Sequence, residues 1–170
     1  KTMVAMKPKT VGRSDGGLAI FPPVDTCGLL ADSIILTLDG ERRVTDLRVG
    51  DRVITRDSGT AVLRGITRHR VRSAAVRIMA GTLGHTRPER DVTLPAGQLL
   101  LVRDWRAKAL FGDEQALVPA TRLVDGEFVT LEAAQEMTIF SLDFATPHIL
   151  YVDGLELASN ADMRLDARAA

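Results

Sequence analysis

Short runs in which apolar and polar residues alternate fill most of this chain, and glycine or proline separates one run from the next. The clearest run begins at Asp32 and contains a strand, an Asp39-Gly40 turn and a short return strand. Both turn residues tolerate positive φ angles, which a two-residue β-hairpin requires. A polar corner at residues 49–51 and another strand follow. The pattern predicts a hairpin that opens a β domain.

The same period of two continues toward the end of the chain. A second Asp-Gly pair, Asp153-Gly154, joins two apolar runs and predicts a closing hairpin over residues 149–157. Further strands are predicted over residues 61–66, 71–78, 91–94, 98–102 and 137–144. The fold class predicted from this pattern is all-β.

One helix is predicted near residues 103–111, where Ala and Lys favour helix and Gly112 occupies the position of a C-terminal cap. We expect Trp105, Ala109 and Leu110 to form its buried stripe, so that the helix anchors the core.

Two stretches share one rhythm. Residues 45–54 and 121–129 each show a polar lead, an apolar pair, a corner of glycine with an acidic residue, and an apolar strand. Similar units within a small β domain predict internal pseudo-symmetry. Residues 1–26 are expected to be a leader, with a short strand at 18–21 that ends at Pro22-Pro23, and residues 161–170 a tail. The domain itself is predicted to span residues 27–160.

Composition narrows the function classes. The chain has 22 basic and 22 acidic residues, and this balance argues against nucleic acid or an anionic membrane as the main partner. The densest basic run, residues 64–77, is expected to cover a solvated face. One cysteine, Cys27, and three scattered histidines make no metal site of about four ligands, and no cofactor is expected. No apolar run reaches the ~18 residues that span a bilayer. The sequence leaves the cellular compartment and the oligomeric state open.

Three blocks resemble the Hint domain, the autoprocessing module of hedgehog proteins and inteins. Residues 35–51 are similar to the family's first strand, its Asp-Gly turn and its Gly-Asp corner, and residues 101–125 keep a second block in the same order. In the third block, His148 and Gly154 keep the family's spacing. The resemblance is strongest to the free-standing bacterial branch. It implies a horseshoe-like all-β fold with pseudo-two-fold symmetry.

The resemblance also implies chemistry. In this family a Cys or Ser at the start of the domain attacks the preceding carbonyl, and a mid-domain histidine protonates the departing nitrogen. The family's pattern places the nucleophile at Gly28, one residue after Cys27, which is the candidate, with Thr26 as the acyl donor. Thr93 begins the segment that carries the family's histidine. That histidine falls at residues 96–98, and none of these is His.

At the other end, His148 matches a family histidine. The terminal Asn falls at Ser159, so the candidate Asn160 is one residue late, and Ala161 cannot act as a second nucleophile. Three hypotheses follow. The first is a Hint module of a larger protein, impaired or inactive in autoprocessing, with a structural or interaction role toward flanking segments of its own polypeptide. The second is an active self-cleaving domain that uses Cys27, helped by Thr93 and His148. The third is an unrelated β-barrel binding module.

Overall fold

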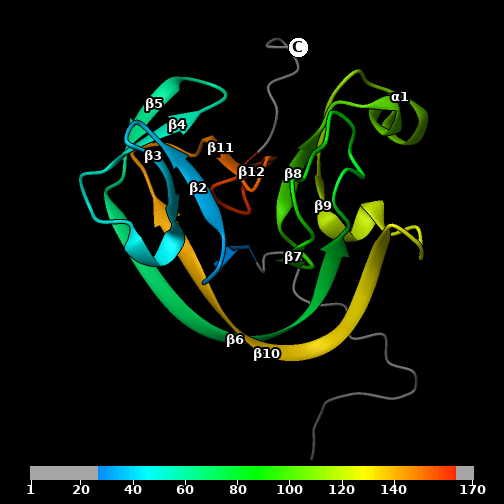
Figure 1. Ribbon diagram of the computed structural model, residues 1–170, viewed down its shortest axis with the longest axis horizontal. Helices are drawn as coiled ribbons and strands as arrows, with labels where there is room; N and C mark the ends of the chain where they lie inside the picture. Colours follow the sequence, from blue (N-terminus) through cyan, green and yellow to red (C-terminus); the bar gives the residue numbers. More distant parts are fainter. Residues whose placement is uncertain (1–26, 164–170) are drawn as a thin grey trace, which may run out of the picture.

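The computed structural model describes residues 27–163 and is built almost entirely of β-strands. Figure 1 shows two lobes joined below by the long curved strands β6 (Gly65–Ile78) and β10 (Val129–Asp143), which gives the molecule the outline of a horseshoe. The predicted all-β class and horseshoe shape are therefore confirmed. The predicted strand at residues 18–21 lies outside the described residues.

The strands form two sheets. The first has the order β1-β10-β6-β7, and the second has the order β3-β2-β4-β11-β12-β8-β9, with β5 paired to β4. The remaining elements are β1 (Leu29–Leu30), β2 (Ile34–Thr37), β3 (Gly40–Arg43), β4 (Arg52–Thr55), β5 (Gly59–Val62), β7 (Val92–Pro95), β8 (Leu99–Val102), α1 (Trp105–Phe111), β9 (Ala116–Pro119), β11 (Ile149–Val152) and β12 (Leu155–Ala158), with 3₁₀ turns η1 (Val44–Asp46) and η2 (Ala120–Leu123).

Both predicted hairpins form, but only the second has its Asp-Gly pair as the two turn residues. In the first, which joins β2 to β3, the turn residues are Leu38 and Asp39, and Gly40, with a φ of 101°, begins β3 and pairs with Thr37. The second joins β11 to β12, where Asp153 and Gly154 have φ angles of 53° and 82°. Asp and Gly are the residues that adopt this backbone region most readily, so the local sequence sets both turns.

The two lobes repeat one unit. In one lobe the hairpin β2-β3 leads into η1, and in the other the hairpin β8-β9 leads into η2. In both, the first residue of the 3₁₀ turn donates to the carbonyl before the first strand: Val44 N to Ser33 O, and Ala120 N to Gln98 O, each at 2.9 Å. This equivalence is the pseudo-symmetry that the repeated rhythm predicts, and it makes Gln98 the counterpart of Ser33.

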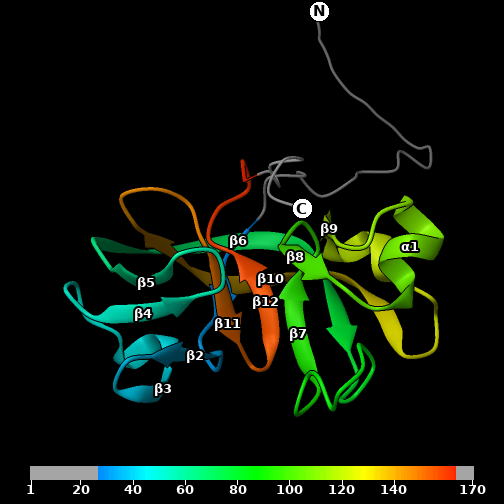
Figure 2. The same ribbon diagram turned by 90° about the horizontal axis from the view of Figure 1, so that it is seen from above.

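The hairpin β11-β12 fills the space between the lobes (Figure 2). Val152 of β11 pairs with Ile35 in the second position of β2, and Leu157 of β12 pairs with Leu100 in the second position of β8. The hairpin thus meets equivalent strands of the two lobes. Its residues are almost fully buried, so it forms the centre of the aliphatic core, and both of its ends are fixed by the packing on either side.

The helix α1 lies within the predicted range, but the predicted buried stripe is wrong. Trp105 and Leu110 are 66% and 53% exposed, and the side chains that the helix buries are those of Arg106 and Ala107. Asp104 caps the N-terminus by accepting from Arg106 N, and Gly112 ends the helix in the left-handed conformation. The apolar spacing gave the wrong face because the helix has only two turns and packs on the core through Ala107 and Phe111.

Candidate functional site

Cys27 lies two residues before β1 and contacts both Gln98, from the middle of the chain, and Ala158, at the end of β12. Its thiol donates to Gln98 Oε1 at 3.1 Å, and its Sγ lies 4.0 Å from the carbonyl oxygen of Ala158. The following residue, Gly28, donates its backbone N–H to the same Gln98 oxygen at 2.9 Å. One side-chain amide therefore connects the start of the domain to its final strand.

The Gln98 side chain is fully buried, and all of its polar capacity is used. Its Oε1 accepts from the Cys27 thiol and from Gly28 N. Its Nε2 donates to Ala158 O at 2.9 Å and to Leu99 O at 2.8 Å. A primary amide has two donor hydrogens and two acceptor lone pairs, so no group remains free to swing toward another partner. The amide is held in a single orientation.

The backbone around Gln98 explains why the side chain points inward. Gln98 N donates to Pro95 O, which closes the turn between β7 and β8, and its carbonyl accepts from Ala120 N. Gly28 has no side chain and lies close to β10: a Cβ at this position would come within 3.0 Å of the Ile139 side chain. The glycine after Cys27 therefore allows the chain just before β1 to pack closely on β10.

Burial weakens the acidity of the thiol. Desolvation raises the pKa of Cys27 from 9.0 to about 11, and hydrogen bonds from the Leu99 backbone and with Gln98 offset only part of this effect. At neutral pH the sulfur is protonated, and the thiol donates its hydrogen bond to the Gln98 oxygen. A base or an opening of the site is needed before the sulfur becomes a strong nucleophile.

His148 lies directly before β11, at the end of the central hairpin where Cys27 contacts Ala158. Ile149 pairs with Ala158, and beyond this pair His148 N donates to Ser159 Oγ while Ser159 N donates to His148 O, both at 2.9 Å. Cys27 thus lies near the carbonyl of Ala158, and His148 is hydrogen-bonded to the next residue, Ser159. No hydrogen bond joins the two side chains within residues 27–163.

Asp57 orients the His148 ring. Its Oδ2 lies 2.9 Å from Nδ1 of His148, and its Oδ1 accepts from Ile149 N at 2.9 Å. The Ser58 hydroxyl lies 3.3 Å from the same ring nitrogen, and Thr146 Oγ1 lies 3.3 Å from Nε2. Because a carboxylate can only accept, Nδ1 of His148 is the donor in this contact.

Within residues 27–163, the other two predicted site residues form no hydrogen bond with Cys27, Gln98 or His148. Thr93 is in β7 opposite Arg77, and within the described part of the chain no hydrogen bond links it to Cys27 or Gln98. Asn160 is exposed, and its Oδ1 accepts from Asp162 N in a local turn. Thr26, the predicted acyl donor, lies outside the described residues.

Sequence reasoning found the position of Gln98 but not its role. It identified residues 96–98 as the place of a family histidine and found none. Gln98 hydrogen-bonds to both ends of the domain, and no local sequence pattern reveals these contacts. Asp57 was missed altogether, because it is one polar residue in a turn and its partner is 91 residues away. Only the fold brings the two together.

A second polar centre lies on the same hairpin. Glu156 is 3% exposed and forms ion pairs with three arginines from separate loops: Arg56, Arg87 and Arg103. A cavity of about 450 Å³ lies beside it, lined also by Glu41, Glu89 and Asp153. Because acidic and basic groups both line it, the cavity has no clear preference for an ion of either sign.

Residues 27–163 hold no cluster of three or more His, Cys, Asp or Glu side chains that could bind a metal ion. Among the helices of this part of the chain, none is long and apolar enough to cross a membrane.

Comparison with known proteins gives one family and several solved structures of similar fold. Residues 27–163 match the family model described as Hint domain, and the match begins at Cys27. The solution structure of a bacterial intein-like domain from Clostridium thermocellum aligns with a TM-score of 0.57 at 14% identity, over 79% of this chain and 99% of that one. The TvoVMA intein aligns with a TM-score of 0.52 at 14% identity, over 79% and 98%. No curated protein sequence matches.

Proposed function

The chain belongs to the Hint domain family, and we propose that it is a member whose self-cleavage at Thr26–Cys27 is impaired, retained as a folded module of a larger protein. The observation that supports this proposal most strongly is the contact of Gln98 with both Cys27 Sγ and Gly28 N. An amide stands where the chemistry of an autoprocessing site needs a proton donor.

The reaction shows what Gln98 cannot supply. Cys27 Sγ would attack the Thr26 carbonyl carbon, forming a carbon–sulfur bond as the Thr26–Cys27 amide bond breaks. The nitrogen must gain a proton as it leaves, because an unprotonated amide nitrogen is a very poor leaving group. A histidine can deliver that proton, whereas the Gln98 amide has no acidic proton at neutral pH. Loss of a general acid costs about 10²–10⁴ in rate.

The state of the sulfur supports the same conclusion. The thiol is protonated at neutral pH, since burial raises its pKa to about 11. It donates a hydrogen bond to the neutral amide oxygen of Gln98, which cannot act as a base. Both the attack step and the departure step therefore lack their usual assistance. The scaffold is nevertheless well formed, with a fully satisfied hydrogen-bond centre, and this favours a folded module over a decayed one.

One observation favours the alternative, an active self-cleaving domain. His148, with its ring held by Asp57, lies at the same end of the central hairpin as Cys27, and Cys27 Sγ lies 4.0 Å from Ala158 O on the strand that faces it. If the Ala158–Ser159 segment moved away, the imidazole of His148 could donate a proton to the leaving nitrogen.

The mass of the chain after incubation with a strong thiol distinguishes the impaired domain from the active one. The purified chain is held with excess dithiothreitol at neutral pH and weighed over a day, beside Cys27→Ala. Impaired chemistry predicts that both proteins keep their full mass. Rapid loss of residues 1–26 from the natural chain but not from the variant would establish the active alternative and end the proposal.

A further inference from the structure

Strand β6 leaves part of one edge unpaired. Along one side it pairs with β10 over its full length, from Gly65 to Ile78. On the other side β7 pairs only with Ala75 to Ile78, and Ala74 O accepts from Ala96 N just before that ladder. From Gly65 to Ser73, no strand of residues 27–163 pairs with this second edge. About 30 Å of strand therefore presents free backbone N–H and C=O groups.

Solvent reaches this edge from both faces. Four consecutive residues, 67–70, are exposed. In a strand with one face covered, exposure alternates from residue to residue, because successive side chains point to opposite faces. Exposure of four in a row shows that the middle of β6 is open to solvent on both faces. The neighbouring strand β10 is paired there with β1 and is buried at Ile139 and Phe140, so β6 is the exposed edge of a three-stranded segment.

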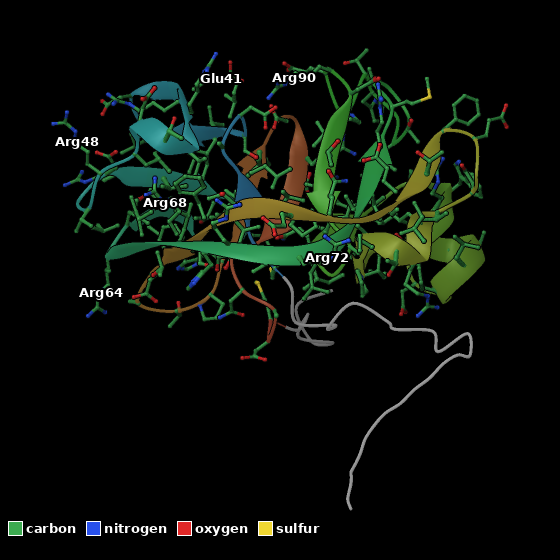
Figure 3. All side chains as sticks on the ribbon, turned by 90° about the horizontal axis from the view of Figure 1, so that it is seen from below. Glu41, Arg48, Arg64, Arg68, Arg72 and Arg90 are labelled. Atoms are coloured by element: carbon green, nitrogen blue, oxygen red, sulfur yellow. The ribbon has the colours of Figure 1, made fainter. Side chains whose placement is uncertain are left out.

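The edge is strongly basic. Arg64, Arg68, Arg70 and Arg72 are separated by even numbers of residues, so they lie on one face of the strand. Arg70 pairs with Glu136 of β10, but Arg64, Arg68 and Arg72 form no ion pair within the described residues. Figure 3 views the ribbon from below with these three labelled along it. The arginines of the run expected to cover a solvated face are exposed, and three of the five form no ion pair within the described residues, although Ser73, Ala75 and Val76 in the same run are buried.

This charge selects what can pair with the edge. A second copy of β6 would place arginine near arginine, and like charges on neighbouring strands destabilise a sheet. An acidic chain is attracted. Because the edge supplies alternating backbone donors and acceptors, it matches an extended polypeptide better than a phosphate chain, which has no donors.

We propose that the bare edge of β6 binds an extended acidic segment of a partner protein, which adds as a strand end to end with β7. Its backbone would bond to residues 65–73, and its carboxylates would meet Arg64, Arg68 and Arg72. This inference rests on the proposed function, since a module without self-cleavage needs another role. The two are tested separately, because binding is measured on Cys27→Ala, which cannot cleave itself.

The probe is a fluorescent peptide of about eight residues in which Glu alternates with Val, blocked at both ends. Anisotropy at low ionic strength should show saturable binding. Methylation of every second amide nitrogen keeps the charge but removes the hydrogen bonds of one peptide edge, and should weaken binding at least about tenfold. The double variant Arg68→Glu with Arg72→Glu should weaken it by a similar factor.

The matched control is Arg43→Glu with Lys108→Glu, which changes the net charge equally at exposed positions of β3 and α1. It should leave the affinity unchanged. The proposal is overturned if the peptide fails to bind, or if the methylated peptide binds as tightly as the unmethylated one. It is also overturned if the control variant loses as much affinity as Arg68→Glu with Arg72→Glu, or if an oligothymidylate of equal charge binds as tightly as the peptide.

Discussion

The thiol of Cys27 lies 3.1 Å from the side-chain oxygen of Gln98, and this contact joins the first described residue to the turn between β7 and β8. The same amide continues to Ala158 O through its nitrogen. The two junctions of the domain are thereby held to one another by a buried side chain that has no acid–base chemistry of its own.

Removing that amide should cost stability. In Gln98→Ala, Gly28 N and Ala158 O lose their partner inside the protein, and a buried polar group without a partner costs about 1–3 kcal/mol. We expect the free energy of unfolding, measured in urea, to fall by about 2–4 kcal/mol. Gln135→Ala, at an exposed position of β10, should change it by less than about 0.5 kcal/mol. Equal losses in the two variants would contradict the role given to Gln98.

The acidity of Cys27 predicts how it reacts with pH. Because its pKa in the folded chain is about 11, alkylation by iodoacetamide at pH 8 should be about 100-fold slower than in the urea-unfolded chain, and its rate should rise toward pH 11. The folded state holds this proton more tightly than the unfolded state. The thiol's contribution to stability is therefore complete below pH 9 and is lost between pH 9 and 11. An alkylation midpoint below pH 9 in the folded chain would be inconsistent with this burial.

The buried carboxylate of Glu156 should matter more than an exposed one. In Glu156→Gln, three arginines keep their positions but lose the charge between them, and breaking a buried ion pair costs up to about 3–5 kcal/mol. We expect about 3 kcal/mol, since these arginines are partly exposed. Glu136→Gln removes an ion pair whose side chains are 77% and 64% exposed, and should cost less than about 1 kcal/mol. Urea titrations of both variants make the comparison.

The contact between Asp57 and His148 is expected to hold two loops together. Asp57→Ala removes the partner of the His148 ring and of Ile149 N, and should lower the free energy of unfolding by about 1–3 kcal/mol. Asp113→Ala, which removes an exposed carboxylate after α1, is the control. If both variants unfold at the same urea concentration as the natural chain, Asp57 does not fix the ring.

Much of the fold could be predicted from sequence, because its signals are local. The hairpins at Asp39-Gly40 and Asp153-Gly154 follow from residue types that adopt positive φ, as Gly40, Asp153 and Gly154 do, and alternation with a period of two indicates the strands. The buried face of α1 could not be predicted, because with only two turns the choice of face depends on what packs against it, and Trp105 remained outside.

The site was predictable only in part, because several of its contacts join residues that are far apart in the sequence. Cys27 and His148 were identified through motifs and do lie at one end of the central hairpin. Gln98, Asp57 and Glu156 act through partners far away in sequence, and their burial depends on the packing of β11 and β12 between the lobes. No pattern of neighbouring residues carries that information.

The central claim is that an amide at Gln98 stands where an acid is needed, and one comparison tests it most directly. Gln98→His places an imidazole at this position, and the natural chain, Gln98→His and Gln98→His with Cys27→Ala are weighed after incubation with dithiothreitol at neutral pH. We predict that only Gln98→His loses residues 1–26, at a rate at least about 100-fold above the natural chain. Cleavage of the natural chain as fast as that of Gln98→His would contradict the account.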